Sequence, residues 1–332
     1  MNLFSIKHKK LLASKFLLLA LFFIIGCSPE SDEIITPSLE DEQALLSNIS
    51  LKSNRVVFSS IDAYQKFLED QDVEQRVNLV NQLNNISSFI SLSSLIKADL
   101  SLSNGRIAEE TLDLEGTIIA DLLNEDGIIE IGEYLFKINM SQEQVLALHR
   151  DNLEDSYNAL LEGDTNNDDI LLFSTNDDVL EMISNGETSS GSNARTALFG
   201  CGENGADKDI DEDNEYYGSD RRMVCRVEYQ KYGIYFSLIA KVKSQKKVAG
   251  IWVGAGYEGE NQGLDFYVKY KPKCRSEVVK QGTVYEDSGD NNELSKRPYE
   301  STRKLHKYHY EAQFSNFYWN QGTRVYTAED GY

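Results

Sequence analysis

Histidine and cysteine, the residues that most often build metal and nucleophilic sites, are scarce in this chain of 332 residues. Beyond residue 26 the sequence has three histidines, His149, His306 and His309. On a strand, positions 306 and 309 point to opposite faces, so these two cannot bind one metal ion together. The four cysteines include no Cys-x-x-Cys spacing. The sequence therefore excludes a zinc site of that kind and offers no Ser-His-Asp constellation.

Basic residues are few in the first part of the chain. Residues 27–200 carry 33 acidic and 9 basic side chains, whereas residues 201–332 carry 21 and 20. An acidic surface repels phosphate backbones, which argues against nucleic acid as a partner. Of the 18 tyrosines, 15 lie in residues 201–332. This change in composition predicts two domains, residues 45–187 and 201–332, joined by a linker over residues 188–200.

The apolar run near the N-terminus is too short for a membrane span of about 20 residues. It covers the 11 residues 16–26 and follows four lysines and no acidic residue. This pattern is typical of an export signal, so residues 1–26 are predicted to be a signal peptide. Residues 24–27, Ile-Ile-Gly-Cys, resemble a bacterial lipobox. The resemblance implies that Cys27 is acylated, as by palmitate, and anchors an outer-membrane lipoprotein; an ordinary signal peptide is the alternative.

The polar, acidic residues after the lipobox predict a tether over residues 27–44 that holds the folded part off the membrane. Residues 28–33 resemble the surface-export tract of Bacteroidota lipoproteins, with a solvated linker as the alternative. Residues 56–60 (VVFSS), 127–138 (GIIEIGEYLFKI) and 305–314 (LHKYHYEAQF) resemble mostly uncharacterised lipoproteins of the same group. The resemblance implies no particular activity, and it leaves open whether the domains face the cell surface or the periplasm.

With Cys27 acylated, three cysteines remain to pair in an oxidising compartment. Cys201 and Cys274 both fall in polar loop sequence, whereas Cys225 alternates with apolar residues on a strand. We therefore predict a Cys201–Cys274 disulfide and a buried, free Cys225.

The fold is predicted to be of the α+β class, with a mostly helical domain first. Helices are expected from Ser60, over residues 77–83, over residues 108–123, and over residues 141–161, where Ser141 and Gln144 resemble a capping box. Residues 128–131 and 134–138 predict a β-hairpin around Gly132 and Glu133.

Hydrophobic residues alternate with a period of two in residues 221–328, which predicts six to eight strands of an antiparallel sandwich or open barrel. The clearest stretches are residues 232–242, 264–270 and 307–314. Gly254, Gly256 and Gly259 match a dinucleotide-binding pattern, but a strand and not a helix is expected next. We therefore expect a glycine-rich hairpin and no bound nucleotide.

Two acidic tracts have the spacing of oxygen ligands in a calcium-binding loop, although both lack the glycine expected at position 6. A solvated acidic loop is the alternative for each. Their candidate ligands are Asp164, Asn166 and Asp168 in the first tract, and Asp209, Asp211, Asp213 and Asp220 in the second.

After the two acidic tracts, aromatic residues beside the predicted strands are the third candidate for a binding site, because exposed rings can stack on sugar rings. Filling of a two-sheet core is the alternative, since aromatic residues favour strands in any case. The candidates are Trp252, Tyr257, Tyr267, Tyr318 and Trp319. The sequence thus favours a non-enzymatic binding module for glycan or protein, anchored in the membrane through Cys27. A structural lipoprotein of envelope assembly is the second hypothesis, and a glycoside or other hydrolase is the third.

Overall fold

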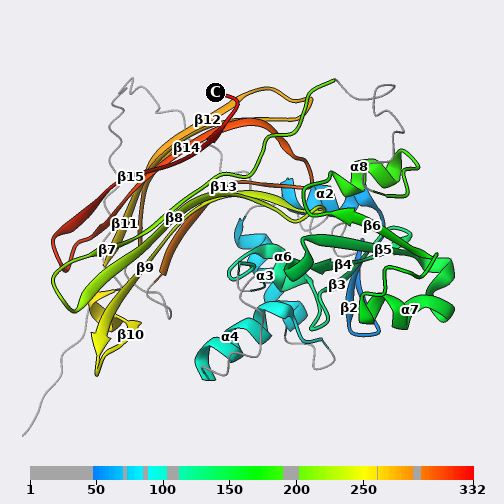
Figure 1. Ribbon diagram of the computed structural model, residues 1–332, viewed down its shortest axis with the longest axis horizontal. Coiled ribbons are helices and arrows are strands. Elements are labelled where there is room, and N and C mark those ends of the chain that lie inside the picture. Colours follow the sequence, from blue (N-terminus) through cyan, green and yellow to red (C-terminus); the bar gives the residue numbers. More distant parts are fainter. Residues whose placement is uncertain are drawn as a thin grey trace, which may run out of the picture. The chain divides into compact units, whose positions relative to one another are not determined.

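The computed structural model describes residues 48–69, 73–84, 89–102, 111, 113–189, 202–259, 261–286 and 293–332. The predicted signal peptide, the lipobox and the whole predicted tether lie outside these ranges, as do residues 190–201. Strands hold more of the described chain than helices do, and they form three sheets (Figure 1).

The first sheet has six strands in sequence order and lies in the half that was expected to be mostly helical. Strands β2 and β3 pair in parallel, and the other neighbours are antiparallel. The strands are β1 (Ile49–Lys52), β2 (Arg55–Phe58), β3 (Ile128–Ile131), β4 (Tyr134–Asn139), β5 (Gln144–His149) and β6 (Ile170–Ser174). The first half therefore holds a six-stranded sheet beside its helices, where one small β-hairpin was predicted.

Helices make the long crossover that a parallel strand pair requires. Between β2 and β3 lie α2 (Ile61–Glu69), α3 (Val73–Asn84), α4 (Leu92–Leu102) and α6 (Ile118–Leu122); α7 (Leu153–Glu162) and α8 (Val179–Ser184) come later. Helix α2 begins as predicted, because the Ser60 hydroxyl accepts a hydrogen bond from the Ala63 N–H at 3.1 Å. Its Tyr64, Phe67 and Leu68 are buried on one face.

The helix predicted over residues 141–161 is a strand, β5, followed by the shorter helix α7. Val145 and Ala147 pack into one apolar cluster, whereas Leu146 and Leu148 pack into a second cluster on the opposite face. A strand that is buried on both faces has a continuous apolar run instead of an alternating one, and such a run cannot be distinguished from a helix by its period. The helix predicted over residues 108–123 is likewise reduced to α6 in the described residues.

The remaining two sheets are antiparallel throughout. One contains β7 (Ile210–Tyr216), β8 (Arg221–Lys231), β9 (Phe236–Val248), β10 (Ile251–Gly254) and β13 (Glu293–Ser301). The other contains β12 (Val278–Glu286), β11 (Gln262–Pro272), β14 (Leu305–Asn316) and β15 (Gln321–Asp330), in that spatial order. Their apolar faces share one core, so the arrangement is sandwich-like.

The alternation predicted for this half is confirmed where the two sheets face each other. Met223, Cys225, Val227 and Tyr229 of β8 are all buried, as are Tyr308, Tyr310, Ala312 and Phe314 of β14. Residues 232–235 belong to a turn instead of the strand predicted from residue 232, because the Tyr232 N–H donates to the Tyr235 carbonyl at 2.9 Å.

This β8–β9 turn packs against the first half of the chain. Tyr232, Ile234 and Tyr235 belong to the apolar cluster that contains Val145 and Phe58, and all described residues fall in one compact unit. The domain boundary predicted at residues 188–200 stays a prediction. Within the described ranges, none of the helices combines the length and apolar character that crossing a membrane would take.

Candidate functional site

Aromatic side chains gather where several turns of the two antiparallel sheets meet. In one sheet, the antiparallel registers place the β7–β8 turn beside the short strand β10. In the other sheet, they place the end of β12 beside the β14–β15 turn. Both groups lie at the same end of the sandwich (Figure 1). We call this region the aromatic end. It comprises Tyr216, Tyr217, Trp252, Tyr257, Tyr285, Phe317, Tyr318 and Trp319.

The rings of the aromatic end lie in contact as pairs from different elements. Tyr257, in the short helix η4 (Gly256–Glu258), meets Tyr318 edge to face at a centroid distance of 5.7 Å. Tyr217 and Trp319 lie 6.4 Å apart, and Tyr285 and Phe317 lie 5.5 Å apart. Such pairs hold each ring in a defined orientation.

Several of these rings are exposed, although burial would be favourable for them. Tyr257 is 70% exposed, Tyr285 is 69% exposed, and Phe317 and Tyr318 are each 54% exposed. Exposed aromatic rings gathered in this way are typical of surfaces that contact another molecule. Beside it lies a hollow of about 540 Å³, bordered by Tyr216, Tyr217, Gly218, Arg221, Tyr318, Trp319 and Gln321.

Glu258 fixes the position of Trp319 at the centre of this end. The Trp319 indole N–H donates to Glu258 Oε2 at 2.9 Å, and Arg221 Nε donates to the same oxygen at 3.2 Å. The hydrogen bond from Trp319 and the nearby Arg221 and Lys246 lower the pKa of the Glu258 carboxyl. At neutral pH this group is therefore ionised and acts as an acceptor, which does not suit the role of a general acid.

Trp252 is held differently from the other rings. The Arg222 guanidinium lies 4.6 Å from its ring centroid and the Lys247 ammonium lies 5.7 Å away, while Tyr216 contacts it at 5.9 Å. The cations lie within range for a cation–π interaction, so part of this ring is already engaged. Tyr257 and Tyr318 consequently offer the more accessible faces.

Four of the five predicted aromatic residues come together, and Tyr267 does not. Tyr267 lies on β11, where it contacts His309 at 6.2 Å and borders a separate groove of about 370 Å³ across β11, β12, β14 and β15. The sequence reasoning missed Tyr216, Tyr217, Tyr285 and Phe317. Tyr216 and Tyr217 directly precede Gly218, and this position at a turn was the available signal.

Comparison with models of known protein families gave no match, and comparisons with curated proteins and with solved structures gave none either.

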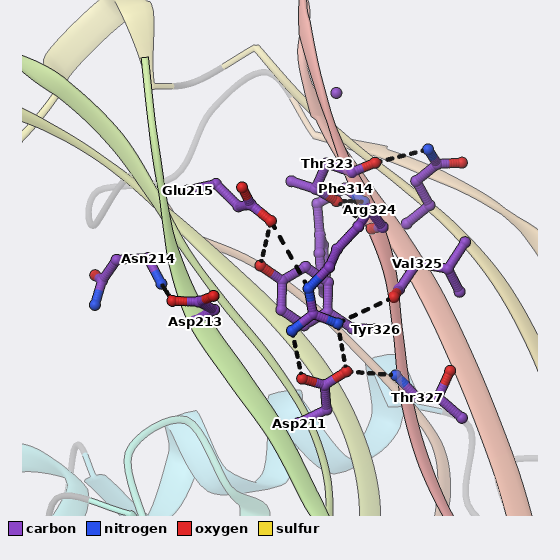
Figure 2. A network of polar contacts seen from close by, with 12 residues as sticks. Asp211, Asp213, Asn214, Glu215, Phe314, Thr323, Arg324, Val325, Tyr326 and Thr327 are labelled. Carbon is purple, nitrogen blue, oxygen red and sulfur yellow. Dashed lines mark hydrogen bonds and ion pairs between the residues drawn. The ribbon is translucent and has the colours of Figure 1, made fainter. Parts of the chain in front are cut away.

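Asp211 and Asp213 of the second acidic tract lie on strand β7 and not in a loop. Asp211 on β7 binds Arg324 on β15 with both oxygens, at 2.6 and 2.7 Å, and Asp211 Oδ2 also accepts the Thr327 N–H at 3.0 Å (Figure 2). Asp209 accepts the Glu329 N–H at 2.9 Å. Asp211 of β7 and Asp209 just before it thus accept backbone N–H groups of β15, which has no strand on this side in the described chain.

The remaining candidate calcium ligands are dispersed or bound locally. Asp213 accepts from the Asn214 N–H, and Asp220 lies 3.4 Å from Arg221. Asp164 accepts from both the backbone and the side chain of Asn166, and Asp168 lies in the same turn. Across the described ranges no three His, Cys, Asp or Glu side chains are grouped to hold a metal ion. Calcium binding at either tract stays a prediction.

The described cysteines differ in state. Cys225 is free and fully buried, as predicted, and burial raises the pKa of its thiol to about 12. Cys274 is disulfide-bonded. Cys201 and Cys27 lie outside the described residues, so the pairing of Cys201 with Cys274 stays a prediction.

Proposed function

We propose that this protein is a lipid-anchored, non-enzymatic module of the outer membrane that binds glycans at the aromatic end. The observation that carries the proposal is the exposure of paired rings from four separate turns and strands at one end of the sandwich. Flat aromatic faces bind the apolar faces of sugar rings, and this contact needs no catalytic group. The export signal and the lipobox-like residues before Cys27 support the location.

Polar groups beside the rings suit the hydroxyl groups of a saccharide. Gln321, Arg221 and Gly218 border the hollow, and Asn261 lies next to Tyr257, whose carbonyl accepts its side-chain N–H at 3.1 Å. A site with apolar faces and a few placed donors and acceptors is the usual form of a small-molecule site. A protein partner would more often require a larger, flatter and continuously apolar contact.

The test is calorimetric titration of the purified full chain with a panel of neutral oligosaccharides. Tyr257→Ala and Tyr318→Ala, tested separately, are each expected to weaken binding about tenfold, since a ring stacked on a planar ligand contributes ~1–3 kcal/mol by alanine substitution. Both residues are more than half exposed, so neither change is expected to unfold the protein.

Tyr267→Ala is the matched control, because it removes a tyrosine ring from the same pair of sheets outside the aromatic end. The proposal requires that Tyr267→Ala leave binding unchanged. If Tyr267→Ala lost saccharide binding while Tyr257→Ala and Tyr318→Ala kept it, the binding site would lie in the groove on β11. Release of reducing ends would support a hydrolase, and the absence of binding to every saccharide would leave the envelope-assembly hypothesis.

A further inference from the structure

A cavity of about 760 Å³ lies away from the aromatic end, between the α2–α3 region and strands β11, β12 and β13. Cavities of this size hold small-molecule ligands. Two carboxylates, Glu69 and Glu300, and six basic residues border it. The basic residues are Arg76, Arg275, Lys280, Lys296, Arg297 and Arg303. A net positive cavity is unexpected in a chain with a formal net charge of −21.

The two bordering carboxylates are already engaged by the protein. Glu300 accepts from the Tyr235 hydroxyl at 2.5 Å and lies 3.1 Å from Arg76 Nη2. Glu69 accepts from Ser301 and from Gln65. Glu300 is paired with Arg76, whereas Glu69 binds neutral donors and keeps its charge, so six cations and two carboxylates leave a surplus of four positive charges.

Four of the cations form no ion pair within 4 Å with a described carboxylate, although Arg303 acts on Glu181 at longer range. No described carboxylate oxygen lies within 4 Å of the side-chain nitrogens of Arg275, Lys280, Lys296 or Arg303. Elsewhere, Arg324 and Lys241 show the usual behaviour, each with acidic partners within that distance. Because acidic residues are plentiful in this chain, the lack of a partner at four neighbouring cations is informative.

Three of the bordering guanidinium groups, those of Arg76, Arg297 and Arg303, also have buried nitrogens without a hydrogen-bond partner in the described chain. Arg76 is 7% exposed and its Nε has no hydrogen-bond acceptor in the described chain, and the same holds for the buried Nε of Arg303. A buried donor without an acceptor costs free energy that a suitable ligand recovers. Arg297 is set aside, because its Nη2 lies beside Gly116.

An irregularity in β13 shapes the wall of the cavity. The register of β13 shifts between Lys296 and Tyr299, and the Pro298 carbonyl accepts from Lys280 Nζ at 2.8 Å and from the Tyr270 hydroxyl at 3.3 Å. Lys280 is thus held at the cavity by a neutral acceptor, and burial lowers the pKa of its ammonium group. Lys296 lies 5.8 Å from the Phe266 ring centroid. The cations are positioned before any ligand arrives.

We infer that this cavity, which we call the basic cavity, binds a small multivalent oxyanion, a molecule that carries carboxylate or phosphate groups. Arg303, Lys280 and Lys296 supply charged donors, and the buried Arg76 supplies a further guanidinium edge. Salt screens charges over about 8 Å at physiological ionic strength, so the local cations outweigh the distant acidic surface. This site is separate from the aromatic end and does not depend on the proposed glycan binding.

The test is titration of the full chain with citrate, with inorganic phosphate, and with glucose as a neutral control, all at matched ionic strength. We expect saturable binding of citrate or phosphate at millimolar concentrations or below, and none of glucose. Comparison of citrate with phosphate tells which acidic group the cavity prefers. Lys280→Gln and Arg303→Gln are each expected to weaken binding about tenfold, because each removes a charge-assisted hydrogen bond.

Lys247→Gln is the matched control, since it makes the same change of charge at the aromatic end. Binding must be unchanged in this variant. Equal weakening in Lys247→Gln and Lys280→Gln would mean that the anions respond to overall charge, and a lack of saturable binding to both anions would overturn the inference. Neither result would affect saccharide binding by Tyr257 and Tyr318, so the two proposals fail separately.

Discussion

The contact between Asp211 and Arg324 joins the edges of the two packed sheets, and its loss is expected to lower the free energy of unfolding by a measurable amount. Asp211 holds the Arg324 guanidinium through two hydrogen bonds and accepts a third from the Thr327 N–H (Figure 2). Arg324 in turn lies 3.9 Å from the Tyr326 ring centroid. Asp211→Asn removes the negative charge and replaces one carboxylate oxygen, an acceptor, with an amide NH2 donor that faces the guanidinium.

The magnitude follows from geometry and exposure. Charge-assisted hydrogen bonds contribute about 1.5–3 kcal/mol when they are shielded from water. Here the side chains of Asp211 and Arg324 are 24% and 46% exposed, so solvent screening reduces that contribution. We expect Asp211→Asn to lower the free energy of unfolding by about 1–2 kcal/mol at pH 7.

The pH dependence has a definite sign. The hydrogen bond from Arg324 is the main cause that lowers the pKa of the Asp211 carboxyl below its ordinary value of 3.8. The contact therefore stabilises the protein fully above that ordinary value, and the contribution is lost as the pH falls through the lower pKa of the folded state. The difference between wild type and Asp211→Asn is expected to shrink in strong acid.

The assay is urea unfolding of the full chain at pH 7 and in acid, with Asp213→Asn as the control. Asp213 lies on the same strand and accepts the N–H of Asn214, and no described cation pairs with it. Its replacement is expected to change the unfolding free energy by less than about 0.5 kcal/mol. Equal costs for the two variants, or a calcium-dependent rise in melting temperature that either variant abolishes, would refute the reasoning.

Three further predictions concern the core, a buried carboxyl and the anchor. Gly233→Ala is expected to destabilise the protein by about 3 kcal/mol in urea unfolding, because a Cβ there would lie 2.6 Å from Val145 Cγ2. Gly218 has the same φ of +75° but more space around it, so Gly218→Ala is expected to cost about 1 kcal/mol. Equal costs for the two variants would show that packing against Val145 does not matter. Burial and the adjacent Glu181 raise the pKa of Asp178 to about 7, so its contribution to stability is full below pH 3.8 and is lost as the pH rises through about 7. Asp178→Asn is accordingly expected to gain stability relative to wild type between about pH 4 and pH 7 in thermal unfolding, and a constant difference over that range would be inconsistent with the raised pKa. Cys27→Ser is expected to move the chain from the membrane to the soluble fraction, whereas unchanged fractionation would favour an ordinary signal peptide.

Sequence pattern predicted the second half of the fold better than the first for a physical reason. Strands β8 and β14 have one face in the shared core, so their apolar residues alternate and the period is visible. Strand β5 is buried on both faces, so its sequence QVLALH has a continuous apolar run and lacks the two-residue alternation that identifies a strand. Sequence therefore predicted the sandwich and, of the six-stranded sheet, the β3–β4 hairpin alone.

The candidate site was predictable in part. Trp252, Tyr257, Tyr318 and Trp319 were identified from their positions beside strands, but the strand register that brings Tyr285 next to Phe317 is not visible in sequence. The acidic tract around Asp211 shows the opposite case. Its spacing resembled a metal-binding loop, whereas Arg324, more than 100 residues later, lies opposite it on another sheet. Contacts between distant segments decided both outcomes.

Tryptophan fluorescence is the most direct test of saccharide binding at the aromatic end, because the chain has two tryptophans and both lie there. A saccharide that binds there is expected to change the emission saturably, with the midpoint found by calorimetry, and Tyr318→Ala is expected to weaken both signals together. Saccharide binding seen by calorimetry without any change in tryptophan emission would place the ligand elsewhere and contradict the account.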